Sequence, residues 1–252
     1  MAFIQLDFLS KCLNMHTAVN IALPMPKDTH APMEDIPCIY LLHDAGEDMT
    51  SWQRNVPVER YANAFGAAVI MPDGALSFYE DMAHGGMYKR YIAEELPFLL
   101  RSYFPVSAKR ERNFIAGCGM GGRGAVKIAL ENPDNYGAAS MFCASHEEEK
   151  ARNEAMESAL FRAYGKDAGA CRRLIEAKAA EVARTGPDTG IFHFTAGEAE
   201  AGVTRSMFES VGGHIQYRFE AFSGRDDWAV REKMLVRFME EIRMPAPEEE
   251  MK

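Results

Sequence analysis

The stretch that most constrains the fold of this 252-residue chain is "NFIAGCGMGGRGAVKIAL", residues 113–130. It begins as an apolar, β-prone run, passes through a glycine-dense turn and leaves in a helical pattern. Glycines at positions 117, 121 and 122 allow a strand and a helix to pack closely around such a turn. A buried strand that turns directly into a helix is typical of a mainly parallel sheet covered by helices.

The same alternation of short apolar runs and longer amphipathic runs continues along the chain, with no internal repeat. The predicted strands are 3–9, 17–23, 38–43, 67–71, 113–116, 138–143, 191–195 and 216–222. The predicted helices are 51–65, 87–103, 123–132, 204–211 and 227–244. We therefore expect one α/β domain over residues 1–252, with a sheet of about eight strands, helices on both faces and βαβ crossovers throughout.

Residues 146–187 depart from this alternation. Two helical stretches, 153–164 and 168–185, follow each other there without a strand between them. We interpret the segment as a small helical cap inserted over the strand ends, with two ordinary surface helices as the alternative. The last eight residues, 245–252, read "PAPEEEMK" and are expected to form a polar tail.

Composition excludes several classes of function. A net charge of -9 argues against nucleic acid or an anionic membrane as partner. The five cysteines contain no Cys-x-x-Cys pair, so neither a disulfide framework nor a thiolate zinc site is indicated, and no cofactor is expected. The first residues lack the basic-then-apolar pattern of a signal peptide, and no run approaches the roughly 18 apolar residues of a membrane span. We expect a cytoplasmic protein.

Several segments, in chain order, resemble the tributyrin-esterase and esterase D branch of the α/β-hydrolase fold, which includes S-formylglutathione hydrolases and feruloyl esterases. The resemblance extends over about residues 3–244. The segments that carry it are "IPCIYLLHDAGEDMTSW", "VIMPDG", "YIAEELPFLLRSYFP", "RNFIAGCGMGGRGAVKIAL", "FTAGEAE" and "FSGRDDW". The resemblance implies an α/β-hydrolase fold and acyl transfer by a Ser-His-Asp triad.

The triad positions implied by the resemblance hold other residues in this chain. The serine position of the Gly-x-Ser-x-Gly elbow is Gly119, the acid is Glu200 and the histidine is Asp226. Glycine offers no nucleophile, and an aspartate with an ordinary pKa of about 3.9 is a poor base at neutral pH. The usual serine-hydrolase mechanism is therefore excluded.

The oxyanion loop also departs from the family pattern, because the expected His-Gly pair is His43-Asp44. A carboxylate at position 44 opposes oxyanion stabilisation if it faces the pocket. For His43 we expect structural hydrogen bonding, and for Cys118, beside the missing serine, a buried thiol that points away from the pocket. The expected oxyanion-loop and pocket residues are His43, Asp44, Ala45, His84, Met120 and Trp228.

Acidic residues are frequent on the loops that this fold gathers at the carboxyl ends of its strands. They are Asp44, Glu47, Asp48, Glu80, Asp81, Glu198, Glu200, Asp226 and Asp227. Most are expected to be solvated charges or helix caps, with Asp226 or Asp227 at the start of the last helix, and Arg123 or Arg225 as neutralising partners. We predict no metal site, while Asp44, Asp226 and His84 stay open as candidate ligands should they converge.

These observations favour a non-catalytic esterase homologue that binds an unknown small molecule in the elbow pocket, or a partner. The alternative is an active hydrolase in which a carboxylate- or metal-assisted site replaces the triad. The family resemblance suggests a homo-oligomer. A third possibility is a subunit that stabilises an active esterase paralogue by forming an oligomer with it.

Overall fold

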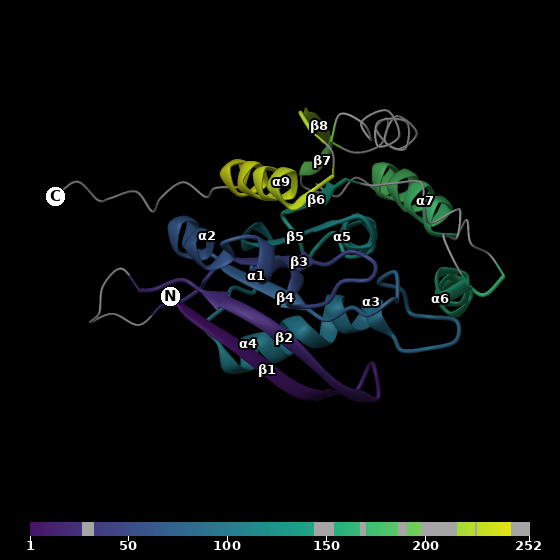
Figure 1. Cartoon of the computed structure of the whole chain (residues 1–252), viewed down its shortest axis with the longest axis horizontal. Coiled ribbons are helices and arrows are strands. Elements are labelled where there is room, and N and C mark those ends of the chain that lie inside the picture. The colour runs from purple at the N-terminus through teal and green to yellow at the C-terminus, as the bar shows by residue number, and fades with distance from the viewer. Residues whose placement is uncertain are drawn as a thin grey trace.

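The computed structural model describes residues 1–26, 33–143, 154–166, 170–185, 191–197, 216–224 and 226–242. Its core is one eight-stranded sheet in the order β1-β2-β4-β3-β5-β6-β7-β8 (Figure 1). The strands are β1 (Ala2–Ser10), β2 (Met15–Leu23), β3 (Cys38–Leu42), β4 (Ala68–Pro72), β5 (Asn113–Cys118), β6 (Ala138–Phe142), β7 (Ile191–Gly197) and β8 (Tyr217–Phe222). The predicted mainly parallel sheet is confirmed.

The amino-terminal part of the sheet differs from the prediction. β1 and β2 form an antiparallel hairpin in which Ser10 faces Met15, and β2 also runs antiparallel to β4. The six strands from β3 to β8 run parallel to one another. Four residues between β1 and β2 are too few for a crossover, which needs about a dozen, so the expectation of βαβ crossovers throughout is wrong here.

The helices follow the predicted segments with local breaks. They are α1 (Ser51–Asn55), α2 (Val58–Phe65), α3 (Tyr88–Arg90), the π-helix η1 (Tyr91–Glu95), α4 (Leu96–Tyr103), the 3-10 helix η2 (Arg110–Arg112), α5 (Met120–Glu131), α6 (Glu154–Tyr164), α7 (Ala170–Thr185) and α9 (Trp228–Glu241). The helix predicted over 51–65 divides at Pro57, and the predicted helix 204–211 lies outside the described residues. Among the described helices, none combines the length and the apolar character needed to cross a bilayer.

Helices cover both faces of the sheet, as the sequence predicts. Side chains of β3 alternate: Tyr40 belongs to a core shared with α4, α5, α6 and α7, and Leu41 to a core shared with α1, α2 and α9. In the predicted cap segment, Leu160 of α6 and Ile175 of α7 belong to the same core as α5. These helices are thus built into the main core, while a cap over the strand ends stays a prediction.

One carboxylate anchors the β1–β2 hairpin to the helical layer. Glu95 of η1 accepts hydrogen bonds from the Ser10 hydroxyl at 2.5 Å and from the backbone N–H groups of Lys11 at 2.6 Å and Cys12 at 3.2 Å. Burial alone raises the pKa of Glu95, but these hydrogen bonds outweigh it and hold the pKa below its ordinary value of 4.5. The ionised carboxylate therefore stabilises the folded chain.

We expect Glu95→Gln to lower the free energy of unfolding by roughly 1–2 kcal/mol at neutral pH. Because the folded-state pKa is depressed, this contribution is present above the ordinary pKa of 4.5 and is lost as the pH falls through the folded-state pKa. Urea unfolding at a series of acidic pH values measures the free energy of unfolding of both proteins. The difference between Glu95→Gln and wild type should narrow below pH 4.5. Glu94→Gln, a change at an exposed neighbouring residue, is the control. A difference in unfolding free energy between Glu95→Gln and wild type that does not depend on pH would contradict a stabilising role for the ionised Glu95 carboxylate.

Candidate functional site

The glycine-rich turn between β5 and α5 has the backbone of a nucleophile elbow without the nucleophile. Gly119 has φ 51° and ψ -114°, in the left-handed region that side chains rarely adopt. The turn is also crowded: a Cβ on Gly117 would lie 2.6 Å from the Gly121 carbonyl carbon, and one on Gly121 would lie 2.6 Å from the His43 oxygen. The close approach of β3, β5 and α5 thus requires glycine at these positions.

The side chain of Asp44 occupies the space beside Gly119. Its Oδ1 atom accepts hydrogen bonds from the backbone N–H of Met120 at 2.8 Å and from that of Ala45 at 2.7 Å. A Cβ on Gly119 would lie 2.1 Å from the same oxygen. The carboxylate and a side chain at position 119 therefore exclude each other.

Those two N–H groups form an anion-binding site. In α/β-hydrolases, the oxyanion hole consists of the N–H after the nucleophile and an N–H from the loop that follows β3. Met120 and Ala45 have these positions in this chain. Met120 is also the first residue of α5, where unpaired N–H groups and the helix dipole favour negative charge. Asp44 thus places the chain's own carboxylate where a hydrolase stabilises its oxyanion.

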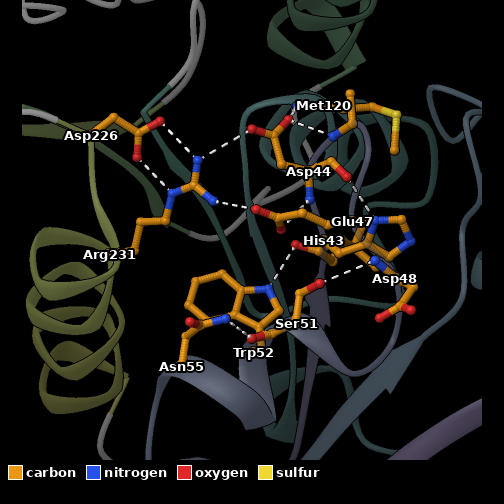
Figure 2. Close-up of polar contacts among 12 residues, drawn as sticks. His43, Asp44, Glu47, Asp48, Ser51, Trp52, Asn55, Met120, Asp226 and Arg231 are labelled. Atoms are coloured by element: carbon orange, nitrogen blue, oxygen red, sulfur yellow. Dashed lines mark hydrogen bonds and ion pairs between the residues drawn. The ribbon is translucent and has the colours of Figure 1, made fainter.

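Arg231 of α9 holds three carboxylates together, and we call these four residues, Asp44, Glu47, Asp226 and Arg231, the Arg231 cluster (Figure 2). Both oxygens of Asp226 accept from the guanidinium, at 2.6 Å from Nε and 2.9 Å from Nη2. Glu47 accepts from Nη1 at 2.8 Å, and Oδ2 of Asp44 from Nη2 at 3.3 Å. The cluster joins the oxyanion loop to the start of the last helix.

The guanidinium of this cluster is buried and permanently charged. Arg231 is 8% exposed and lies over the Trp228 ring, 5.0 Å from its centre. Burial alone lowers the pKa of Arg231, but the hydrogen bond with Asp226 and the neighbouring negative charges raise it well above its ordinary value. Trp228 in turn packs edge-to-face on Trp52 at 5.2 Å. Arg231 therefore serves as a fixed counter-ion.

His43 is fully committed to hydrogen bonds that shape the oxyanion loop. Its Nε2 accepts from the Gly74 N–H at 2.8 Å, so Nδ1 carries the hydrogen and donates to the Asp44 carbonyl at 2.8 Å. The Tyr79 hydroxyl donates to the His43 carbonyl at 3.1 Å. With 1% exposure and both ring nitrogens engaged, His43 orients the loop that carries Asp44.

The side chains of Cys118, His84 and Asp227 make no hydrogen bond or ion pair with the Arg231 cluster among the described residues. Cys118 is buried in the core that contains Trp52, and burial raises the pKa of its thiol well above the ordinary value, so it is no ready nucleophile. The ring of His84 stacks on Phe161 at 5.1 Å. Asp227 caps α9, accepting from the Val230 N–H at 2.9 Å.

The acidic loop residues do not form a metal site in the part of the chain that the structure describes. No group of three His, Cys, Asp or Glu side chains there is arranged to hold a metal ion. Asp48 bonds the Thr50 hydroxyl at 2.6 Å, and Glu80 pairs with the buried Lys127. Glu198, Glu200 and Arg225 lie outside the described residues, so the predicted triad acid has no described position.

Sequence reasoning missed Arg231 and named Arg123 and Arg225 as the neutralising residues instead. A signal was present, because Arg231 stands in the first turn of α9, three residues after Trp228. A cation near the positive end of a helix dipole is unfavourable unless carboxylates compensate it. Because Arg231 stands one helical turn after "DDW", its position in the sequence indicates that acidic side chains neutralise it.

We expect Arg231→Met to destabilise the protein by roughly 3 kcal/mol, because it leaves three neighbouring carboxylates without their buried counter-ion. Arg237→Met is the matched control on the same helix: Arg237 pairs with Glu220 and Glu241 but is 46% exposed, so its loss should cost much less than the loss of Arg231. Chemical unfolding of both variants gives the comparison. Equal losses contradict a structural role for the Arg231 cluster.

Comparison with known proteins identifies the family. The family model described as "Putative esterase" matches residues 10–173, more than half of the chain. An acetyl esterase from Caldicellulosiruptor saccharolyticus is 30% identical over 142 residues, which are 54% of this chain and 53% of that enzyme, so the match spans about half the length of this curated relative.

Solved structures resemble the whole chain. FphF, a fluorophosphonate-binding serine hydrolase of Staphylococcus aureus, has 25% identity and a TM-score of 0.84, with 97% of this chain and 99% of FphF covered. An S-formylglutathione hydrolase (FrmB) from Staphylococcus aureus has 26% identity and a TM-score of 0.82, covering 96% and 99%. The chain belongs to the esterase family and has the α/β-hydrolase fold that its sequence predicts.

Proposed function

We propose that this chain is a non-catalytic member of the esterase family, in which the hydrolytic site has become an internally occupied anion site. The observation that carries the proposal is the position of Asp44. Its carboxylate takes both N–H donors, from Met120 and Ala45, and fills the space that a side chain at Gly119 would need.

The nucleophile, the base and the oxyanion donors that the family's reaction requires are missing or engaged elsewhere. Gly119 has no nucleophilic atom, and both carboxylate oxygens of Asp226 accept hydrogen bonds from Arg231. A substrate carbonyl entering the two N–H groups would have to displace Asp44. Displacement breaks three hydrogen bonds or ion pairs of that side chain, so it is unfavourable.

A rebuilt hydrolase is the second candidate, because three carboxylates do converge at the elbow. Such a site needs one carboxylate that is free to activate water. In the described part of the chain, each of the three is tied to Arg231, which disfavours this reading. Loss of a measured activity in Asp226→Ala, with the fold retained, would support the second candidate over the first.

A non-catalytic esterase homologue would act by binding. It would bind a small molecule near the elbow, or a protein partner such as a second copy of the chain or an active paralogue. The thiols of four cysteines are free, which suits the reducing cytoplasm in which we place the protein; they are Cys12, Cys38, Cys118 and Cys143.

The purified protein should not hydrolyse 4-nitrophenyl acetate or S-formylglutathione above the rate in buffer, and a fluorophosphonate probe should not label it. Both results are expected because position 119 offers no oxygen that an ester could acylate or a fluorophosphonate could phosphonylate. A family member that binds fluorophosphonate serves as the positive control. Saturable hydrolysis that is abolished by Asp226→Ala contradicts the proposal.

Asp44 and Gly119 should be energetically coupled. Gly119→Ser should destabilise the wild-type chain by roughly 1–3 kcal/mol, because the new side chain overlaps the Asp44 carboxylate. In an Asp44→Gly background the overlap is gone, so the same change should cost at least about 1 kcal/mol less. Backbone strain at position 119 is common to both backgrounds and cancels in this double-mutant cycle.

The control for this cycle is an Asp48→Gly background. Asp48 is on the same loop but bonds Thr50, so its removal should leave the cost of Gly119→Ser unchanged. Equal costs in all three backgrounds, measured by chemical unfolding, would falsify the claim that Asp44 occupies the nucleophile's space.

A further inference from the structure

A cavity of about 350 Å³ lies at the end of the sheet opposite to the elbow. Its walls include Tyr40 of β3, Tyr136 just before β6, and Glu94, Phe98 and Arg101 from η1 and α4. We call it the amino-end cavity, because Asn113, the first residue of β5, also lines it, whereas the elbow follows the last residue of β5. Its volume falls within the range of small-molecule sites.

Two buried tyrosines, Tyr40 and Tyr136, are among the residues that line this cavity. Tyr40 and Tyr136 are each 2% exposed, and their rings pack edge-to-face with centres 6.0 Å apart. Burial raises the pKa of both phenols, so the hydroxyls keep their protons at neutral pH. The Tyr136 hydroxyl is buried and has no hydrogen-bond partner among the described residues. An unsatisfied buried hydroxyl is costly, and a bound acceptor would relieve that cost.

The π-helix shapes one wall of the cavity. Pro97 has no N–H, so it cannot bond the carbonyl of Ala93, four residues earlier. The side-chain amide of Asn135 donates to that carbonyl instead, at 3.4 Å. This contact ties the loop that carries Tyr136 to the helix. Single-turn π-helices of this kind are frequent at functional sites.

The two charged residues that line the cavity in the described part of the chain, Glu94 and Arg101, both come from the wall formed by η1 and α4. Arg101 lies seven residues after Glu94, two turns along, so both project from the same side. Burial raises the pKa of Tyr40 and of Tyr136, and the positive charge of Arg101 partly offsets that rise at both phenols. Arg101 forms no ion pair with another described residue, so its charge is available to an anionic ligand. Glu94 is the one acidic residue among the described residues that line the cavity, and it would repel a ligand with a second negative charge.

We propose that the amino-end cavity binds a small aromatic monocarboxylate. The carboxylate would pair with Arg101 and accept a hydrogen bond from the Tyr136 hydroxyl. The ring would pack against the two tyrosines and Phe98, which is 69% exposed without a ligand. This site is separate from the Arg231 cluster and does not depend on whether the elbow is catalytic.

Benzoate is the probe, with binding to the full chain measured by calorimetry and by amide chemical-shift changes. Arg101→Gln should weaken binding about two- to fivefold, as expected for a partly exposed ion pair. Glu94→Gln, the matched change of opposite sign on the same wall, should strengthen binding. The chemical-shift changes should centre on the residues that line the cavity.

Tyr136→Phe separates a binding role from a packing role. It removes only the hydroxyl, so it should weaken benzoate binding about two- to tenfold while leaving the unliganded protein as stable as wild type, or more stable. A tyrosine that served the fold alone would show no effect on binding.

Five outcomes overturn the proposal. They are no benzoate binding, benzylamine binding as tightly as benzoate, unchanged affinity in Arg101→Gln, unchanged affinity in Tyr136→Phe, and chemical-shift changes centred on Met120 and Trp228, which would assign the ligand to the elbow.

Discussion

The structure around the elbow depends on one interaction, the pair of hydrogen bonds that the backbone N–H groups of Met120 and Ala45 donate to the Asp44 carboxylate. A helix N-terminus and a tight loop create positive potential there whether or not a reaction occurs. In a serine hydrolase that potential is kept for a transient oxyanion. In this chain a permanent carboxylate satisfies it, and Arg231 balances the charge.

The form of the elbow turn does not depend on a nucleophile at position 119. The strained backbone at Gly119 follows from the close packing of β3, β5 and α5, which the flanking glycines permit. Packing therefore preserves the turn independently of chemistry. Glycine at position 119 suits aspartate at position 44, because a side chain at position 119 would overlap the Asp44 carboxylate.

The sequence predicted the fold through local patterns and the elbow through its glycines, since both signals lie within short stretches of chain. It also identified Asp44 and Asp226 as departures from the family. It did not predict that Arg231 joins them, because those contacts link positions up to 187 residues apart and depend on tertiary structure. The β1–β2 hairpin and the break at Pro57 were missed because apolar alternation reports strands and helices without their connections.

The rest of the site depends on the position of Asp44 in the oxyanion hole of an esterase fold, in place of a substrate. A crystal structure of the unmodified protein, at a resolution that orients carboxylates, tests it most directly. The account predicts one Asp44 oxygen within hydrogen-bonding distance of both the Met120 and Ala45 nitrogens, and the other oxygen directed at Arg231. An Asp44 side chain turned to solvent, with water or an anion between the two N–H groups, would contradict it.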